Sequence, residues 1–263
     1  MTVTPDRLLA RLEAIGASLA TRADALGLLG LGSVGRERQR LDVWSDLDFF
    51  VFVQPGAKPR YLDSLEWLAA AHPLAWHFRN TADGHKALMA DGVFCEFAVF
   101  EPQEIAAIPY APGRWVWRRD ELDAALEVSP RPPPTGGTVD VEWCVGEALS
   151  NLIVGLQRLA RGETLAAMRM IQVFAVDRAL ELAEHAQQTE HGVRRDPFAR
   201  ERRIEQRAPA LAAALPHWVQ GYAATVPSAL ALLDWLQAQH RVPPAVSAQI
   251  RALAAQAAAP SGR

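Results

Sequence analysis

The sequence predicts an α+β protein, with a mixed β-sheet flanked by helices in its first half and a helical bundle in its second half. Three observations support this fold class. Short apolar runs typical of strands lie before residue 129, a proline- and glycine-rich stretch follows, and the rest of the chain has helical periodicity. We therefore expect a sheet-containing domain at 1–128, a linker at 129–139 and a helical domain at 140–263.

The N-terminal segment is expected to form an amphipathic helix. Leu8, Leu12, Ile15 and Leu19 recur at helical spacing, and charged residues lie between them. A secretory signal peptide would instead carry an unbroken apolar segment and a cleavage site. The segment is therefore interpreted as part of the fold.

Several apolar runs in the first half predict strands. Residues 46–53 form a run whose continuity indicates a strand covered on both faces. Residues 61–71 have a helical pattern, and 74–80 and 93–100 are expected to be strands. The piece between them, 82–92, is either another strand of a meander or a loop.

The second half begins after three consecutive prolines and a glycine pair within 129–139. Such residues continue neither a helix nor a central strand. Residues 141–163 and 164–185 are then strongly helical and meet near Gly162, which predicts a helical hairpin. Further helices are expected up to the C-terminal tail.

Composition argues against several classes of protein. No apolar run reaches the roughly 18 residues of a membrane span, and a net charge of −3 disfavours a protein that coats nucleic acid. The arginines of 194–207 alternate with acids, which predicts a solvated, salt-bridged helix. Cys95 and Cys144 lie in apolar surroundings, so we expect neither a disulfide framework nor a zinc site, and a cytoplasmic protein.

Two aspartates mark the start of the strand at 46–53. Asp46 and Asp48 are two residues apart, so both carboxylates would lie on one face of the strand. Close carboxylates repel one another unless they hold a cation or a proton, and oxygen-only ligation suits Mg²⁺. Glu96 is a third acid in an otherwise apolar run, where it either completes this site or forms a structural ion pair.

A glycine–serine turn precedes these acids. Gly32 and Ser33 offer backbone N–H groups and a hydroxyl that could cradle a phosphate. Arg36, Arg38 and Arg40 would add charge-assisted hydrogen bonds to phosphate oxygens. The combination predicts a site for Mg²⁺ and a nucleoside triphosphate.

These motifs resemble those of the nucleotidyltransferase superfamily related to DNA polymerase β, and most of all those of the lincosamide nucleotidyltransferases. The segment GSVGRERQRLDVWSDLDFFVFV is similar to the Gly-Ser and Asp-x-Asp signature, and GVFCEFAVF is similar to the strand with the third acid. The segment SNLIVGLQRLARGETLAAMRMIQ resembles the family's helical hairpin. The resemblance implies a catalytic domain of nucleotidyltransferase type followed by a helical domain.

The resemblance also implies residue roles. Asp46, Asp48 and Glu96 would be the catalytic carboxylates and Mg²⁺ ligands, with Glu96 either a ligand or the general base. Gly32 and Ser33, together with Arg36 and Arg38, would bind the nucleoside triphosphate. The implied reaction transfers a nucleoside monophosphate to a hydroxyl of a small molecule, such as a lincosamide- or aminoglycoside-like antibiotic, and releases pyrophosphate.

Two other functions stay open at this point. The acceptor could be a protein, since the same catalytic residues would serve. The chain could instead be a silent homologue that binds only a nucleotide or a partner, although three converging acids argue against silence. The helical half leaves both a homodimer and a monomer open.

Overall fold

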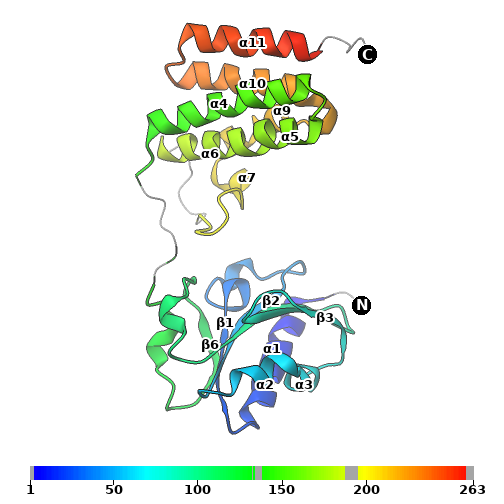
Figure 1. The fold of residues 1–263 in the computed structure, drawn as a ribbon. Coiled ribbons are helices and arrows are strands. Elements are labelled where there is room, and N and C mark those ends of the chain that lie inside the picture. The colour runs from blue at the N-terminus through cyan, green and yellow to red at the C-terminus, as the bar shows by residue number, and fades with distance from the viewer. Residues whose placement is uncertain (1–2, 132, 134–137, 187–194, 259–263) are drawn as a thin grey trace. The chain divides into compact units, whose positions relative to one another are not determined.

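The computed structural model describes residues 3–131, 133, 138–186 and 195–258. The chain divides into two compact units, Met1–Pro134 and Thr135–Arg263, and each is described by itself (Figure 1). The predicted linker at 129–139 lies partly outside the described residues and stays a prediction. The α+β fold class is confirmed, because a mixed sheet with helices is followed by a region made of helices.

The first unit is built on one six-stranded sheet with the order β3-β4-β5-β2-β1-β6. β2 and β5 run parallel, whereas the other neighbouring pairs are antiparallel. The parallel pair places the first residues of β2 and β5 at the same edge of the sheet. The strands are β1 Ala25–Gly30, β2 Leu47–Val53, β3 Leu74–Arg79, β4 Gly84–Met89, β5 Phe94–Phe100 and β6 Arg114–Arg118.

Most of the strand predictions are confirmed. The expected strands at 46–53, 74–80 and 93–100 are β2, β3 and β5, and the ambiguous range 82–92 contains β4. β2 begins at Leu47, so Asp46 lies just before the strand.

Three helices pack on one face of the sheet: α1 Pro5–Ala20, α2 Lys58–Asp63 and α3 Glu66–Ala69 (Figure 1). Thr4 caps α1 by accepting a hydrogen bond from the backbone N–H of Arg7 at 3.3 Å. The single helix expected at 61–71 is wrong, since Ser64 adopts an extended conformation and separates α2 from α3.

The second unit begins with the predicted helical hairpin, which is confirmed. α4 Val141–Ala160 is followed by Gly162, whose φ of +82° suits a glycine after a helix C-terminus. α5 Thr164–Arg169 then continues through a π-helical turn, Met170–Ala175, into α6 Val176–His185. Buried apolar residues on these helices form the core of the unit.

Five further helices complete the described part of the second unit. They are α7 Ile204–Arg207, α8 Pro209–Ala212, α9 Leu215–Trp218, α10 Thr225–Gln239 and α11 Pro244–Ala258. α10 and α11 pack against one another and against α4. No helix among the described residues is long and apolar enough to cross a membrane.

The solvated helix expected at 194–207 is wrong for the described part of that range. Only its last four residues are helical, and Asp196 and Arg207 are buried. The arginines turn inward because α6 presents acids to them. Arg207 lies 2.9 Å from a carboxylate oxygen of Glu184, and Arg200 lies 3.1 Å from the other oxygen of the same residue.

Candidate active site at the start of the parallel strands

Asp48 and Glu96 are register partners on the two parallel strands. Partners in adjacent strands point to the same face, so both carboxylates belong to one face of the sheet. Both residues are only partly buried, whereas their neighbours Leu47 and Cys95 are buried on the opposite, helix-covered face. The fold therefore brings together two of the three predicted acids.

Asp46 lies two residues before Asp48 and is partly buried. Asp46 lies close enough to β5 for its charge to affect the thiol of Cys95. Burial first of all, and then the charges of Asp46, Asp91 and Asp48, raise the pKa of Cys95 to about 12, although Arg11 acts in the opposite direction. The thiol therefore stays protonated at neutral pH, which disfavours it as a nucleophile or a metal ligand.

The Gly-Ser turn lies directly beside Asp48. Gly32 has a φ of +50°, and a methyl group added to it would lie 3.9 Å from the Oδ2 atom of Asp48. The turn is tied to β2 because the backbone N–H of Leu31 donates to the carbonyl of Asp48 at 2.8 Å. Two further N–H groups, those of Gly35 and Glu37, donate to the carbonyl of Gly32, each at 3.1 Å. The predicted phosphate turn and the predicted metal ligands are thus adjacent.

The predicted phosphate-binding arginines have different surroundings. Arg36 donates to the carbonyl of Gly113 at 2.9 Å and lies 2.7 Å from a carboxylate oxygen of Glu127. It would have to exchange these partners to reach a phosphate. Arg38 is exposed, and Arg40 forms an ion pair with Glu37. Arg36 is exposed as well, but Arg38 is the one of the three for whose side chain the described residues provide no hydrogen bond or ion pair.

Arg114 is a cation beside the turn that the sequence did not reveal. On β6, Arg114 is the register partner of Gly30 on β1, and its guanidinium donates to the carbonyl of Val34 at 3.4 Å. Its Nε atom is buried and has no hydrogen-bond partner among the described residues. Burial first, and then the charge of Arg38, lower the pKa of Arg114, while Glu13, whose carboxylate lies 3.9 Å from the guanidinium, acts in the opposite direction. Two guanidinium groups therefore lie near the turn, where an anion would stabilise both.

Glu96 has an ion-pair partner and a hydrogen-bond partner that the sequence analysis did not predict. Lys86 is its register partner on β4, and the ammonium nitrogen lies 3.1 Å from the Oε2 atom. The side-chain amide of Asn80 donates to the Oε1 atom at 3.4 Å. The strand assignment of 82–92 was open from the sequence, so this pairing could not be predicted.

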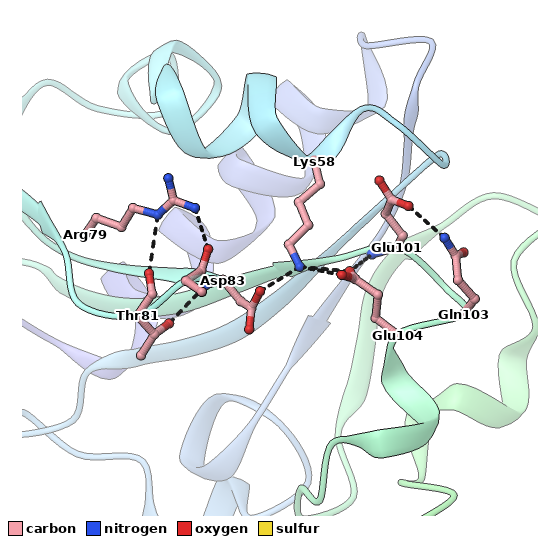
Figure 2. A network of polar contacts seen from close by, with 8 residues as sticks. Lys58, Arg79, Thr81, Asp83, Glu101, Gln103 and Glu104 are labelled. Atoms are coloured by element: carbon pink, nitrogen blue, oxygen red, sulfur yellow. Dashed lines mark hydrogen bonds and ion pairs between the residues drawn. The ribbon is translucent and has the colours of Figure 1, made fainter.

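A polar network fixes the turn that carries Asn80 (Figure 2). Arg79 donates to the carbonyl of Thr81 at 3.3 Å, and Lys58 reaches from α2 to Asp83 at 2.7 Å and to Glu104 at 2.7 Å. Although burial acts in the opposite direction, the hydrogen bonds to these two acids raise the pKa of Lys58. The β3–β4 turn is therefore held to α2 and to the segment after β5.

The carboxylates fit a magnesium ion in part. In the described portion of the chain, no three His, Cys, Asp or Glu side chains are grouped so that they could hold a metal ion. Glu96 has Lys86 and Asn80 as partners, so Asp46 and Asp48 are the first candidates for the donor set. Two carboxylates suit Mg²⁺, which usually completes its shell with water and substrate phosphates. The role of Glu96 as a ligand stays a prediction.

Comparison with solved structures gives a distant structural likeness. No family model and no curated protein sequence matches the chain. Among solved structures, it is similar to an aminoglycoside 6-adenyltransferase from Bacillus subtilis, with 12% identity and a TM-score of 0.32. The alignment covers 93% of this chain and 97% of that one.

Proposed function

We propose that the chain is a Mg²⁺-dependent nucleotidyltransferase that moves a nucleoside monophosphate from a nucleoside triphosphate to a hydroxyl of a small molecule. The observation that carries this proposal is the register pairing of Asp48 with Glu96, next to the Gly32 turn. A carboxylate pair beside a turn and two arginines is a suitable arrangement for a metal-bound triphosphate. Lincosamide- and aminoglycoside-like compounds are the first acceptors to test.

Each part of the site has a chemical task in this proposal. Asp46 and Asp48 would hold Mg²⁺, which when bound offsets the negative charge of the phosphates. The backbone N–H groups at Gly32 and Ser33 would bind phosphate oxygens, because the first N–H groups of a helical turn lack acceptors within it. Arg38 and Arg114 would stabilise the departing pyrophosphate.

The transfer itself needs little covalent chemistry from the protein. The acceptor oxygen forms a bond to the α-phosphorus while the bond from that phosphorus to the β-phosphate oxygen breaks, and pyrophosphate leaves. The hydroxyl proton passes to a carboxylate oxygen of Glu96 or to water. The ammonium nitrogen of Lys86 lies 3.1 Å from the Oε2 atom of Glu96, which favours one orientation of this carboxylate.

Nucleotide binding is the direct test. We would titrate Mg²⁺ with a non-hydrolysable ATP or GTP analogue into the wild type and into an Asp46→Asn/Asp48→Asn variant. Asp120→Asn is the matched control, because Asp120 is an exposed aspartate beyond the other end of β1. Metal-dependent binding that only the double variant loses supports the proposal, and absence of binding to either nucleotide in the wild type contradicts it.

The acceptor is tested separately with α-labelled ATP or GTP. Candidate hydroxyl compounds and a cell extract are incubated with the enzyme, and the label is followed into small molecules and into protein bands. Labelled small molecules support the proposed acceptor class, whereas labelled protein favours a protein-modifying enzyme. Sedimentation of the same preparation would decide between a monomer and a homodimer.

A further inference from the structure

The helical unit contains a cavity of about 750 Å³ that the proposed transfer does not use. Its wall comes from the π-helical turn, α6 and the segment from α7 to α9. The lining is mainly apolar, and two of its residues, Val173 and Val219, are 40% and 50% exposed. A cavity of this size is typical of sites for small molecules.

The wall of the cavity is held by a buried glutamine. Gln172 lies in the π-helical turn, and its side-chain amide both donates to and accepts from the backbone of Gly221, each at 2.8 Å. Gly221 has a φ of +92°, a conformation that L side chains rarely adopt. π-Helical turns within α-helices are frequent at functional sites. The geometry of the cavity is therefore fixed by specific contacts rather than by loose packing.

Three carboxylates line the same cavity: Asp177, Glu201 and Glu205. None of them forms a side-chain hydrogen bond or an ion pair with any part of the chain that the structure describes. Burial first of all raises the pKa of Asp177, and the charge of Glu201 acts in the same direction, whereas the charge of Arg178 opposes them. These acids, of which Glu201 and Glu205 are exposed, thus place negative charge next to apolar surface without a direct ion-pair partner among the described residues.

Nearby arginines compensate the charge of Asp177 only in part. Arg178 and Arg200 lie close enough to affect Asp177. Both form ion pairs with Glu181 instead, at 2.9 and 2.8 Å. The positive charge on this side of α6 is therefore already engaged, and the cavity is complementary to an external cation.

We propose that the cavity binds a small molecule in which an apolar body carries one ammonium group. The apolar body would cover Val173 and Val219, and the ammonium group would lie among Asp177, Glu201 and Glu205. This inference concerns the helical unit alone and does not rest on the proposed transferase activity.

The test uses three probes with one alkyl chain and different head groups: n-octylammonium, 1-octanol and octanoate. Binding to the full-length protein is measured by calorimetry and by ligand-observed NMR. We expect n-octylammonium to bind about tenfold more tightly than 1-octanol and octanoate to bind most weakly, because charge-assisted hydrogen bonds are stronger than neutral ones.

Two variants test the two parts of the site. Asp177→Asn/Glu201→Gln should weaken n-octylammonium about tenfold and leave 1-octanol unchanged within twofold, whereas Glu142→Gln, an exposed acid on α4, should change neither. Val219→Trp should fill the cavity and weaken both probes. Circular dichroism confirms that each variant is folded.

Three results would overturn the inference. The first is equal binding of all three probes, and the second is unchanged affinity in Asp177→Asn/Glu201→Gln. The third is a wild type that is a dimer and does not bind n-octylammonium, together with a Val219→Trp variant that is a monomer. The cavity would then be an interface between two copies of the chain. A nucleotide-site variant, Asp48→Asn, should bind n-octylammonium normally, so failure of the transferase proposal remains distinguishable.

Discussion

Two glycines on either side of β2 allow a sharp test of the proposed phosphate turn. Gly32 and Gly56 both have positive φ values, +50° and +80°, and both have room for a methyl group. The nearest atom to a methyl group on Gly32 is Oδ2 of Asp48 at 3.9 Å, whereas Gly56 has nothing within 4 Å. The two positions therefore share a positive φ but differ in what lies beside them.

Replacing either glycine with alanine should cost stability by a similar amount. A left-handed conformation is less favourable for an L residue by roughly 1–2 kcal/mol, so Gly32→Ala and Gly56→Ala should lower the free energy of unfolding by that much. The backbone N–H of Gly56, which donates to Glu101 at 2.7 Å, is kept in the variant. Urea denaturation followed by tryptophan fluorescence measures both changes.

Binding of the metal-nucleotide complex should separate the two variants. In Gly32→Ala the methyl group takes space beside the Asp48 carboxylate, where a phosphate or its metal would lie. We expect the dissociation constant to rise about tenfold, equivalent to about 1.4 kcal/mol, while Gly56→Ala stays within twofold of the wild type. Calorimetric titration of the Mg²⁺ complex of an ATP or GTP analogue provides the measurement. Equal affinities in the two variants would refute the assignment of the turn.

Three further predictions concern the first unit. In a double-mutant cycle, Lys86→Met and Glu96→Gln should couple by less than about 1 kcal/mol in urea denaturation, because both side chains are more than one third exposed; a larger coupling would indicate a mainly structural pair. Burial lowers the pKa of His85 from 6.5, so the unfolded chain binds its proton more readily and the free energy of unfolding should fall as the pH drops below about 6.5. His85→Leu should show a smaller fall between pH 7.5 and 5, and an identical pH dependence would contradict this. Asp91→Asn should lower the unfolding free energy by about 3 kcal/mol in urea denaturation, since it leaves the largely buried Arg11 without its 2.7 Å ion-pair partner; a loss below 1 kcal/mol would be evidence against a buried pair.

The strands were predictable where one physical signal dominated. The run from Phe49 to Val53 is apolar because both faces of that part of β2 are covered, and a strand follows from that pattern without further information. Residues 82–92 were ambiguous for the opposite reason. β4 carries Lys86 and the buried His85 on alternate faces, so neither polarity nor hydropathy distinguishes it from a loop until its partners are known.

The helical predictions failed where tertiary contacts override local pattern. The single helix expected at 61–71 is broken at Ser64, and the chain there is held by a buried tryptophan whose indole N–H donates to the carbonyl of Tyr61 at 3.1 Å. The segment before Arg207 has a helical distribution of charges, yet the acids of α6 draw its arginines inward. Charge patterning along a sequence does not reveal partners that lie on another element.

The candidate site, too, was predictable from local sequence patterns but not from contacts between distant segments. Spacing alone predicted that Asp46 and Asp48 act together, and an acid in an apolar run singled out Glu96. Register decided the rest, because Lys86 faces Glu96 across β4 and β5 and Arg114 lies next to Gly30 across β6 and β1. Such cross-strand neighbours depend on pairings between distant segments, which one sequence does not specify.

The partners of Glu96 bear on whether it acts as a base or as a ligand. Its Oε2 atom lies 3.1 Å from the Lys86 ammonium, whereas its Oε1 atom accepts only a long 3.4 Å hydrogen bond from Asn80. Each carboxylate oxygen has two lone pairs, and a bond of that length is weak. Oε1 is therefore the oxygen that can take a proton or a metal at little cost, while Lys86 keeps Oε2 in place. If Glu96 acts in the proposed transfer, the ion pair would orient its carboxylate, and Oε1 would be the oxygen that takes the proton or the metal.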